Sequence, residues 1–200
     1  MPLSKIQAES MNLADTYAFT GTVSGASNET HVLLSSVTSS ASTTNHDITG
    51  VFSSTYSTYF IEVTMKPENS NYQYEWQFLD SSNNPITSGY YGGIYGYRDN
   101  DTSAGIRSSS TASGRFSNDG SNSRLANFQC YVIAPYNSES NLKRLNFTGG
   151  YFGGTNVFTA CSGSMWNTST TLATGIRFKT NGTPINRFAC QVYGIRSTTI

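Results

Sequence analysis

The sequence has few charged residues, with 12 basic and 12 acidic side chains among 200 and a formal net charge of zero. A protein that binds a nucleic-acid backbone uses clustered Lys and Arg to release counterions. The sequence contains no such cluster, so it predicts that DNA and RNA are not partners. Its polarity comes instead from Ser, Thr and Asn.

Long apolar runs are also missing. No stretch approaches the roughly 20 apolar residues that span a bilayer. The first residues, up to Phe19, lack the apolar core of a secretory signal. We therefore expect no membrane insertion, and we expect the chain to act in the cytoplasm where it is made or to leave it by another route.

Cysteine is scarce and its count is odd, with three residues far apart at Cys130, Cys161 and Cys190. An odd number without a signal peptide argues against a disulfide framework. Each lies among apolar or aromatic residues, which predicts buried free thiols. A zinc site requires ligands at fixed spacing, and His31 and His46 do not supply it. No metal is predicted.

Motifs for catalysis are absent or incomplete. The run Asp99–Asp101 begins like a calcium loop, but Ala104 and Ser110 stand where a glycine and an acidic ligand are needed. Glu62 and Glu75 are the least poor pair for glycoside cleavage, yet nothing in the sequence brings them together. The G-x-S-x-G and phosphate-loop patterns are missing. The sequence predicts no enzyme, no catalytic residue and no cofactor.

The abundant residues favour β-structure. The chain has 13 Tyr, 11 Phe and 18 Gly. Ser, Thr and Asn compete with the helical backbone, whereas Thr, Tyr and Phe suit a pleated strand. Eight to ten short strands separated by turn residues indicate a sandwich or barrel, with a jelly roll preferred. We expect one jelly-roll-like β-sandwich domain over residues 15–200, with a short N-terminal extension over residues 1–14.

Two stretches give the clearest strand patterns. Residues 171–196 read as two strands joined at Asn181-Gly182, because this dipeptide adopts the positive φ angles of a tight hairpin turn. In the second strand an apolar face alternates with a wetter face; the apolar residues are Phe188, Cys190 and Val192, and the others are Ala189, Gln191 and Tyr193. Residues 72–78 place four aromatic side chains on one face, which predicts a buried face: Tyr72, Tyr74, Trp76 and Phe78.

Residues 88–123 carry the most suggestive signal for binding. The first part, 88–97, is rich in Gly and Tyr, and residues 98–123 are nearly all polar. The polar part is expected to be an exposed excursion or a short hairpin around 107–116. Tyr rings among small neighbours can stack on sugars, form a subunit interface or enter the core. The ligand-binding candidates are Tyr90, Tyr91, Tyr95 and Tyr97.

The N-terminal residues 1–12 are polar and could form one helical turn, which is too short to be stable alone. Two interpretations remain: a disordered terminus, or an anchoring peptide that orders on a partner. The anchoring candidates are Leu3, Ile6, Met11 and Leu13.

Three segments carry a resemblance to a known group. They are HDITGVFSSTYSTYFIEV (46–63), YQYEWQFLD (72–80) and GIRFKTNGTPINRFACQVYGIR (175–196). The chain resembles, over residues 31–195, small virion proteins of tailed bacteriophages, often from phages of marine bacteria, that are called tail-fibre or structural proteins. The resemblance implies a jelly-roll-like domain displayed on the particle as a homotrimer, and it implies no catalytic residue.

The expected function is therefore that of a virion protein assembled in the host cytoplasm. It would form a tail fibre or tip, or a head fibre or decoration, and adhere to the host. Its partners would be other virion proteins and a host surface glycan, with residues 88–123 as the outward face. The alternative is a carbohydrate-binding module without a role in virion assembly.

Overall fold

The computed structural model describes residues 30–69, 72–98, 103–117, 123–139, 143–152 and 158–196 of the chain. Every regular element in these ranges is a β-strand. The strands are β1 (His31–Ser39), β2 (Asn45–Ile48), β3 (Thr58–Pro67), β4 (Tyr74–Leu79), β5 (Tyr90–Arg98), β6 (Ser103–Thr111), β7 (Gly114–Arg115), β8 (Ala126–Ile133), β9 (Lys143–Phe152), β10 (Phe158–Asn167), β11 (Gly175–Thr180) and β12 (Ile185–Ile195).

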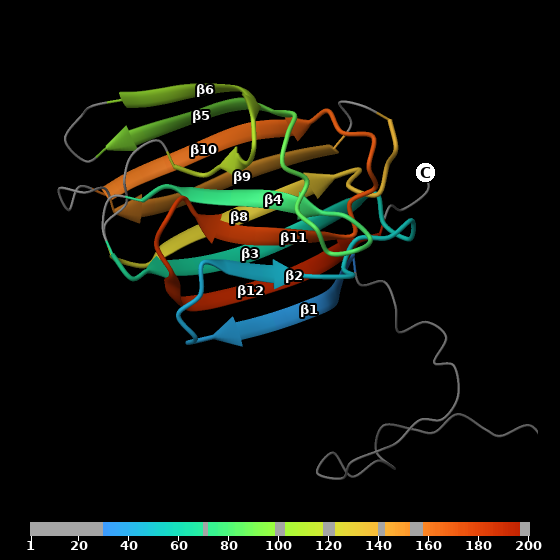
Figure 1. Ribbon diagram of the computed structural model, residues 1–200, viewed down its shortest axis with the longest axis horizontal. Helices are drawn as coiled ribbons and strands as arrows, with labels where there is room; N and C mark the ends of the chain where they lie inside the picture. The colour runs from blue at the N-terminus through green and yellow to red at the C-terminus, as the bar shows by residue number, and fades with distance from the viewer. Residues whose placement is uncertain are drawn as a thin grey trace, which may run out of the picture.

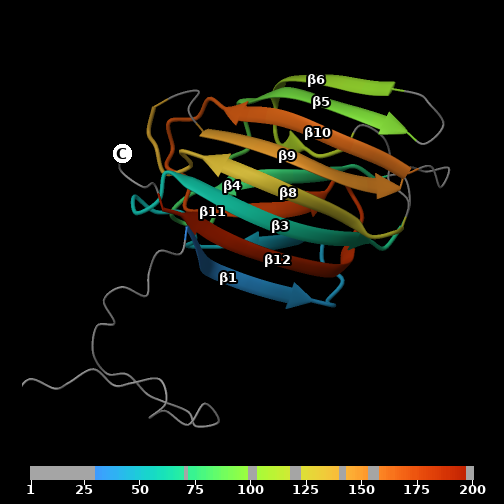
Figure 2. The ribbon, with the colours of Figure 1, turned by 180° about the vertical axis from the view of Figure 1, so that it is seen from behind.

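The strands form two antiparallel sheets that pack face to face. The large sheet has eight strands in the order β1-β12-β3-β8-β9-β10-β5-β6, and the small sheet has four in the order β2-β11-β4-β7. Figure 1 shows β4, β11 and β2 in front of the large sheet, and Figure 2 shows the large sheet from its other side. The prediction of an all-β sandwich is confirmed.

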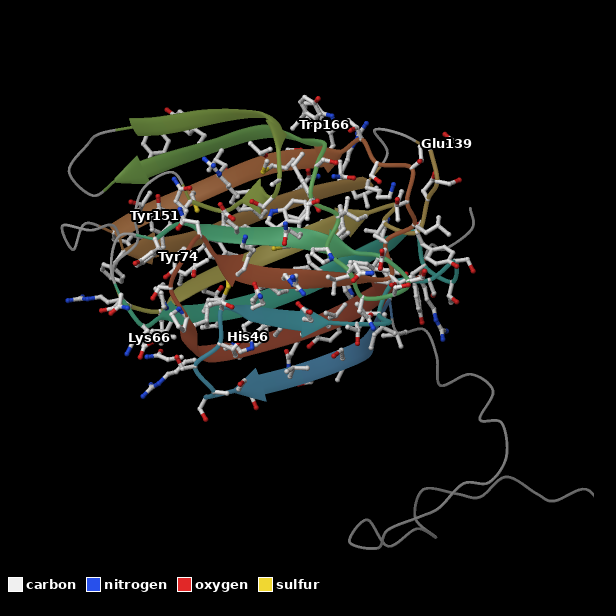
Figure 3. The ribbon with its side chains drawn as sticks, in the orientation of Figure 1. His46, Lys66, Tyr74, Glu139, Tyr151 and Trp166 are labelled. Atoms are coloured by element: carbon white, nitrogen blue, oxygen red, sulfur yellow. The ribbon has the colours of Figure 1, made fainter. Side chains whose placement is uncertain are left out.

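The core between the sheets is rich in aromatic side chains. Tyr74, Trp76 and Phe78 of β4 have no exposed surface, which confirms the buried face predicted for this strand, while Tyr72 precedes β4 and is half-buried. In Figure 3 the labelled Tyr74 and Tyr151 lie toward the same end of the sandwich, and their ring centroids are 6.1 Å apart. Aromatic pairs at such separations add stability beyond the area they bury.

The predicted hairpin at residues 171–196 is wrong in its pairing. Both strands exist, but β11 pairs with β2 and β4 in the small sheet, whereas β12 pairs with β1 and β3 in the large sheet. The turn therefore crosses between layers. The reason is that each strand presents an apolar face to the same core from opposite sides, and Phe178 meets Phe188 at 5.9 Å.

The alternation predicted within β12 is confirmed. Phe188, Cys190 and Val192 are at most 3% exposed and face the core. Tyr193 on the opposite face is half-buried, and Gln191 is exposed.

Residues 103–111, predicted as an exposed excursion or as part of a short hairpin around 107–116, form strand β6, and the hairpin lies between β5 and β6. Strand β6 pairs with β5 along its length, from Tyr90 opposite Thr111 to Tyr97 opposite Ser103, and this hairpin extends the large sheet. The chain then joins β4 through β7, and Phe116 is fully buried. Strand pairing satisfies the polar backbone here.

All three cysteines are free and buried, as predicted. Burial raises the pKa of Cys161 and of Cys190 to about 12, and it raises the pKa of Cys130 strongly. A thiol with so high a pKa holds little of the reactive thiolate at neutral pH.

Stability is expected to fall on mild acidification because of His46. Its ring is 8% exposed and stacks on Phe188 at 4.2 Å. Burial lowers the pKa of His46, opposed by a backbone hydrogen bond with Ile185 and by the charge of Asp47. In the unfolded chain the pKa of His46 is near 6.5. At pH values between the lowered pKa and 6.5, the unfolded chain therefore binds more protons than the folded one. The free energy of unfolding therefore decreases as pH falls through this window.

Urea unfolding of the wild type and of His46→Phe, measured between pH 7.5 and pH 5, tests this effect. The variant keeps an aromatic ring against Phe188 and lacks the titrating group, so its unfolding free energy should fall less. Equal pH dependence in the two proteins would contradict the assignment to His46.

Candidate binding face

The outer face of the large sheet carries two groups of exposed and half-buried aromatic side chains. This face points away from the small sheet and is the one seen in Figure 2. Because successive side chains of a strand point to opposite faces, the residues next to each of these rings in the sequence point toward the small sheet. We call the two groups the edge cluster, formed by Tyr91, Tyr95, Tyr97 and Trp166, and the aromatic strip, formed by His31, Phe60, Tyr131 and Tyr193.

The edge cluster lies on β5 and β10. Tyr91 is opposite Trp166 in the register, and their rings stack with centroids 6.0 Å apart. Tyr95 and Tyr97 meet edge to face at 5.0 Å. Tyr97 is the most exposed of the large hydrophobic side chains described, at 61%. Figure 3 shows Trp166 at the margin of the molecule, away from the core side chains.

Tyr90 does not belong to this cluster, so the prediction that four tyrosines share one site is corrected to three. Tyr90 has no exposed surface and lies against Trp76 at 5.3 Å. The Phe78 N–H donates a hydrogen bond of 2.7 Å to Tyr90 Oη. Burial raises the pKa of Tyr90. The period of two along β5 explains the difference, because Tyr90 points inward while Tyr91, Tyr95 and Tyr97 point outward.

The aromatic strip runs across four strands that are distant in the sequence. In the register, Tyr193 of β12 is opposite Phe60 of β3, and Phe60 is opposite Tyr131 of β8. His31 of β1 is opposite Ile195, two residues from Tyr193 on β12. The Phe60 ring lies 5.2 Å from that of Tyr131, 6.2 Å from that of Tyr193 and 6.1 Å from that of His31.

An open hollow of about 330 Å³ lies over this strip, and its lining adds Glu62 to the four rings. This volume is at the lower end of the range for small-molecule sites. The strip therefore offers both aromatic surface and one carboxylate.

A polar row lies beside the aromatic strip, two residues further along the strands. Gln191, Glu62 and Gln129 face each other across β12, β3 and β8. Gln129 Nε2 donates to Glu62 Oε1 at 3.0 Å, and the Tyr193 hydroxyl donates to Gln191 Oε1 at 2.9 Å. These bonds hold both amides in fixed orientations.

Two further hollows continue from the first along β12 and β3. One of about 210 Å³ shares Glu62 with it and is also lined by Gln191, Thr64 and Ala189. The next, of about 400 Å³, shares Thr64 and Ala189 and reaches Arg187. Each hollow shares lining residues with the next, and we call this row of three adjoining hollows, from the aromatic strip to Arg187, the outer trough.

The acidic pair considered for glycoside cleavage is not brought together. Glu62 lies on the outer face of the large sheet. Glu75 lies on the outer side of the small sheet, where Ser113 Oγ donates to it at 2.8 Å and the charges of Lys179 and Arg115 are 3.3 Å and 3.7 Å away. The sandwich therefore separates the two carboxylates.

Several predictions from the sequence fall outside the described residues. Asp99 and Asp101, and the anchoring candidates Leu3, Ile6, Met11 and Leu13, lie there. Within the described ranges, no three side chains of His, Cys, Asp or Glu gather closely enough to hold a metal ion. No helix of that same part of the chain is long and apolar enough to cross a membrane.

The aromatic strip and the polar row were not found from the sequence. The available signal is the place of Phe60 and Tyr131 in their strands, where each alternates with buried residues on either side. Comparisons with protein-family models, with curated proteins and with solved structures found no match.

Proposed function

We propose that this chain is a structural and adhesive protein of a bacteriophage virion, displayed as a tail fibre or tip or as a head fibre or decoration. The observation that carries the adhesive role is the row of exposed aromatic rings on the outer face of the large sheet. Exposed Tyr and Trp supply rigid contact area at low entropic cost, and contiguous apolar area on a surface marks an interaction site. The placement on a virion is supported by the resemblance of three sequence segments.

We also propose that the domain is a jelly roll, and the strand order supports this. When the hairpins β5–β6 and β9–β10 are set aside, four strands remain in each sheet, in the orders β1-β12-β3-β8 and β2-β11-β4-β7. The chain changes sheet at each step along these eight strands, except between β4 and β7. Two interleaved Greek keys give this order. The hairpins then widen one sheet and present the edge cluster.

Attachment to the particle is assigned to residues 1–14, with Leu3, Ile6, Met11 and Leu13 as apolar contacts. Deleting these residues should leave a folded sandwich that no longer joins particles. Thermal unfolding shows whether the shortened chain still folds. Incorporation is measured by immunoblot of purified particles, after complementation of a phage that lacks the protein. Normal incorporation of the shortened chain would exclude this segment as the anchor.

Adhesion by the edge cluster predicts a loss of host binding in Tyr95→Ala/Tyr97→Ala. Both side chains are exposed, so the fold should persist, while removal of central aromatic contacts typically weakens an interface roughly ten-fold or more. Binding of fluorescent protein to host cells measures the effect. Tyr136→Ala is the matched control, since Tyr136 is 39% exposed but lies in the loop after β8. Equal binding by the two variants would contradict the assignment.

A carbohydrate-binding module without a virion role is the second candidate, and the same exposed rings favour it. The two functions differ in one measurement. A virion protein is recovered with purified particles, whereas a free module is recovered with the soluble fraction of the lysate.

A further inference from the structure

We propose that the outer trough is a binding site for an extended oligosaccharide, separate from the edge cluster. The inference deepens the adhesive function proposed above by naming a second site and its ligand class. It depends on three features of the trough: the aromatic strip, the polar row and the length of the hollow that joins them.

The aromatic strip suits the apolar face of a sugar ring. Phe60 lies between Tyr131 and Tyr193, with planes tilted by 48° and 35° to its own, and the hollow above these rings is open to solvent. A pyranose carries C–H groups on one face and hydroxyls around its rim, so it can pack on such rings while its hydroxyls stay accessible. Tyr131 is 47% exposed, which leaves ring surface for this contact.

The polar row suits the hydroxyl groups around that rim. A carboxylate accepts about four hydrogen bonds and a side-chain amide both donates and accepts. Glu62 uses one oxygen to hold Gln129, and Gln191 is held by the Tyr193 hydroxyl. Groups fixed before a ligand arrives lose little entropy on binding it. The row begins roughly 7 Å from the strip, at two residues of strand rise.

The length of the trough points to a chain of sugars. From Tyr193 to Arg187 the strand covers roughly 20 Å at its usual rise per residue. Thr64 and Ala189 line the middle section, where their small side chains leave room for a ligand. Beyond the strip the lining combines polar and apolar side chains, among them Gln191, Thr64 and Ala189, and such a mixture can contact both the hydroxyls and the C–H groups of a glycan.

The test uses the full chain and a printed array of immobilised oligosaccharides, in length series from one to six sugars, with bacterial surface polysaccharides. We expect binding that strengthens with chain length. In Phe60→Ala it should fall at least ten-fold, and in Glu62→Gln, which keeps the side-chain volume, it should fall several-fold. Thermal unfolding of each variant shows whether the fold is kept. Tyr136→Ala, in the loop after β8, serves as the control and should retain the length dependence. Tyr95→Ala/Tyr97→Ala is measured beside it, to separate binding in the trough from adhesion by the edge cluster.

Three results would overturn the inference. The first is an array without binding. The second is binding that Phe60→Ala and Glu62→Gln leave unchanged while Tyr95→Ala/Tyr97→Ala removes it, which would place adhesion in the edge cluster and leave the proposed function standing. The third is a change of mass by light scattering in Phe60→Ala without a change in glycan binding, which would identify the trough as an interface between copies of the chain. Failure of the proposed virion function appears separately, as absence of the protein from particles.

Discussion

Replacing Phe116 by alanine is expected to lower the free energy of unfolding by about 3–5 kcal/mol, the range for removal of a buried aromatic ring. Phe116 has no exposed surface. Its ring stacks on Phe128 at 4.5 Å and meets Phe147 edge to face at 5.0 Å. It also follows β7, so its ring ties the edge of the small sheet to the large sheet. A cavity here would open between the two layers.

Urea unfolding at neutral pH measures this loss. The midpoint should fall with little change in the dependence on urea, because the surface exposed on unfolding is nearly the same. Phe158→Ala is the control, since Phe158 is 41% exposed on the outer face of β10, and its cost should be below about 1 kcal/mol. Similar losses in the two variants would show that Phe116 is not a central contact of the core.

Phe116 also shows where sequence reasoning failed for the fold. It is a lone apolar residue in a polar stretch, so no period of two or of 3.6 surrounds it. Where a strand is long enough to alternate, as in β4 and β12, the buried face was predicted correctly. The predicted pairing of β11 with β12 is wrong. A tight turn fixes only the local backbone, whereas the sheet that the next strand joins depends on the packing of the whole core.

The candidate site could be predicted in part, for a related reason. The parity of Tyr91, Tyr95 and Tyr97 on one strand is a local property, and it separates them from Tyr90. The aromatic strip joins Phe60, Tyr131 and Tyr193 only through the register of β12, β3 and β8. Such a register is set by long-range packing, because a slip of one residue would move each side chain to the other face. The sequence pattern of a single segment therefore does not predict the register between strands.

Gly114→Ala is expected to cost about 3 kcal/mol of unfolding free energy, at the upper end for overpacking in a core. Gly114 is opposite Trp76 in the register of β7 and β4, and the indole lies over it. A Cβ on Gly114 would be 2.1 Å from Cε2 of Trp76 and 2.4 Å from Cζ2. The indole has no room to withdraw, because Phe78 and Tyr90 pack on it at 5.0 Å and 5.3 Å.

Gly105→Ala is the matched control for this prediction, because Gly105 is also a strand glycine. A Cβ there would be 3.8 Å from its nearest neighbours, which is ordinary contact, and the loss of chain entropy in the unfolded state should make the change neutral or slightly stabilising. Tryptophan fluorescence during urea unfolding measures both variants. If Gly114→Ala were as stable as Gly105→Ala, Trp76 could move aside, and the contact between β7 and β4 would not depend on the missing side chain.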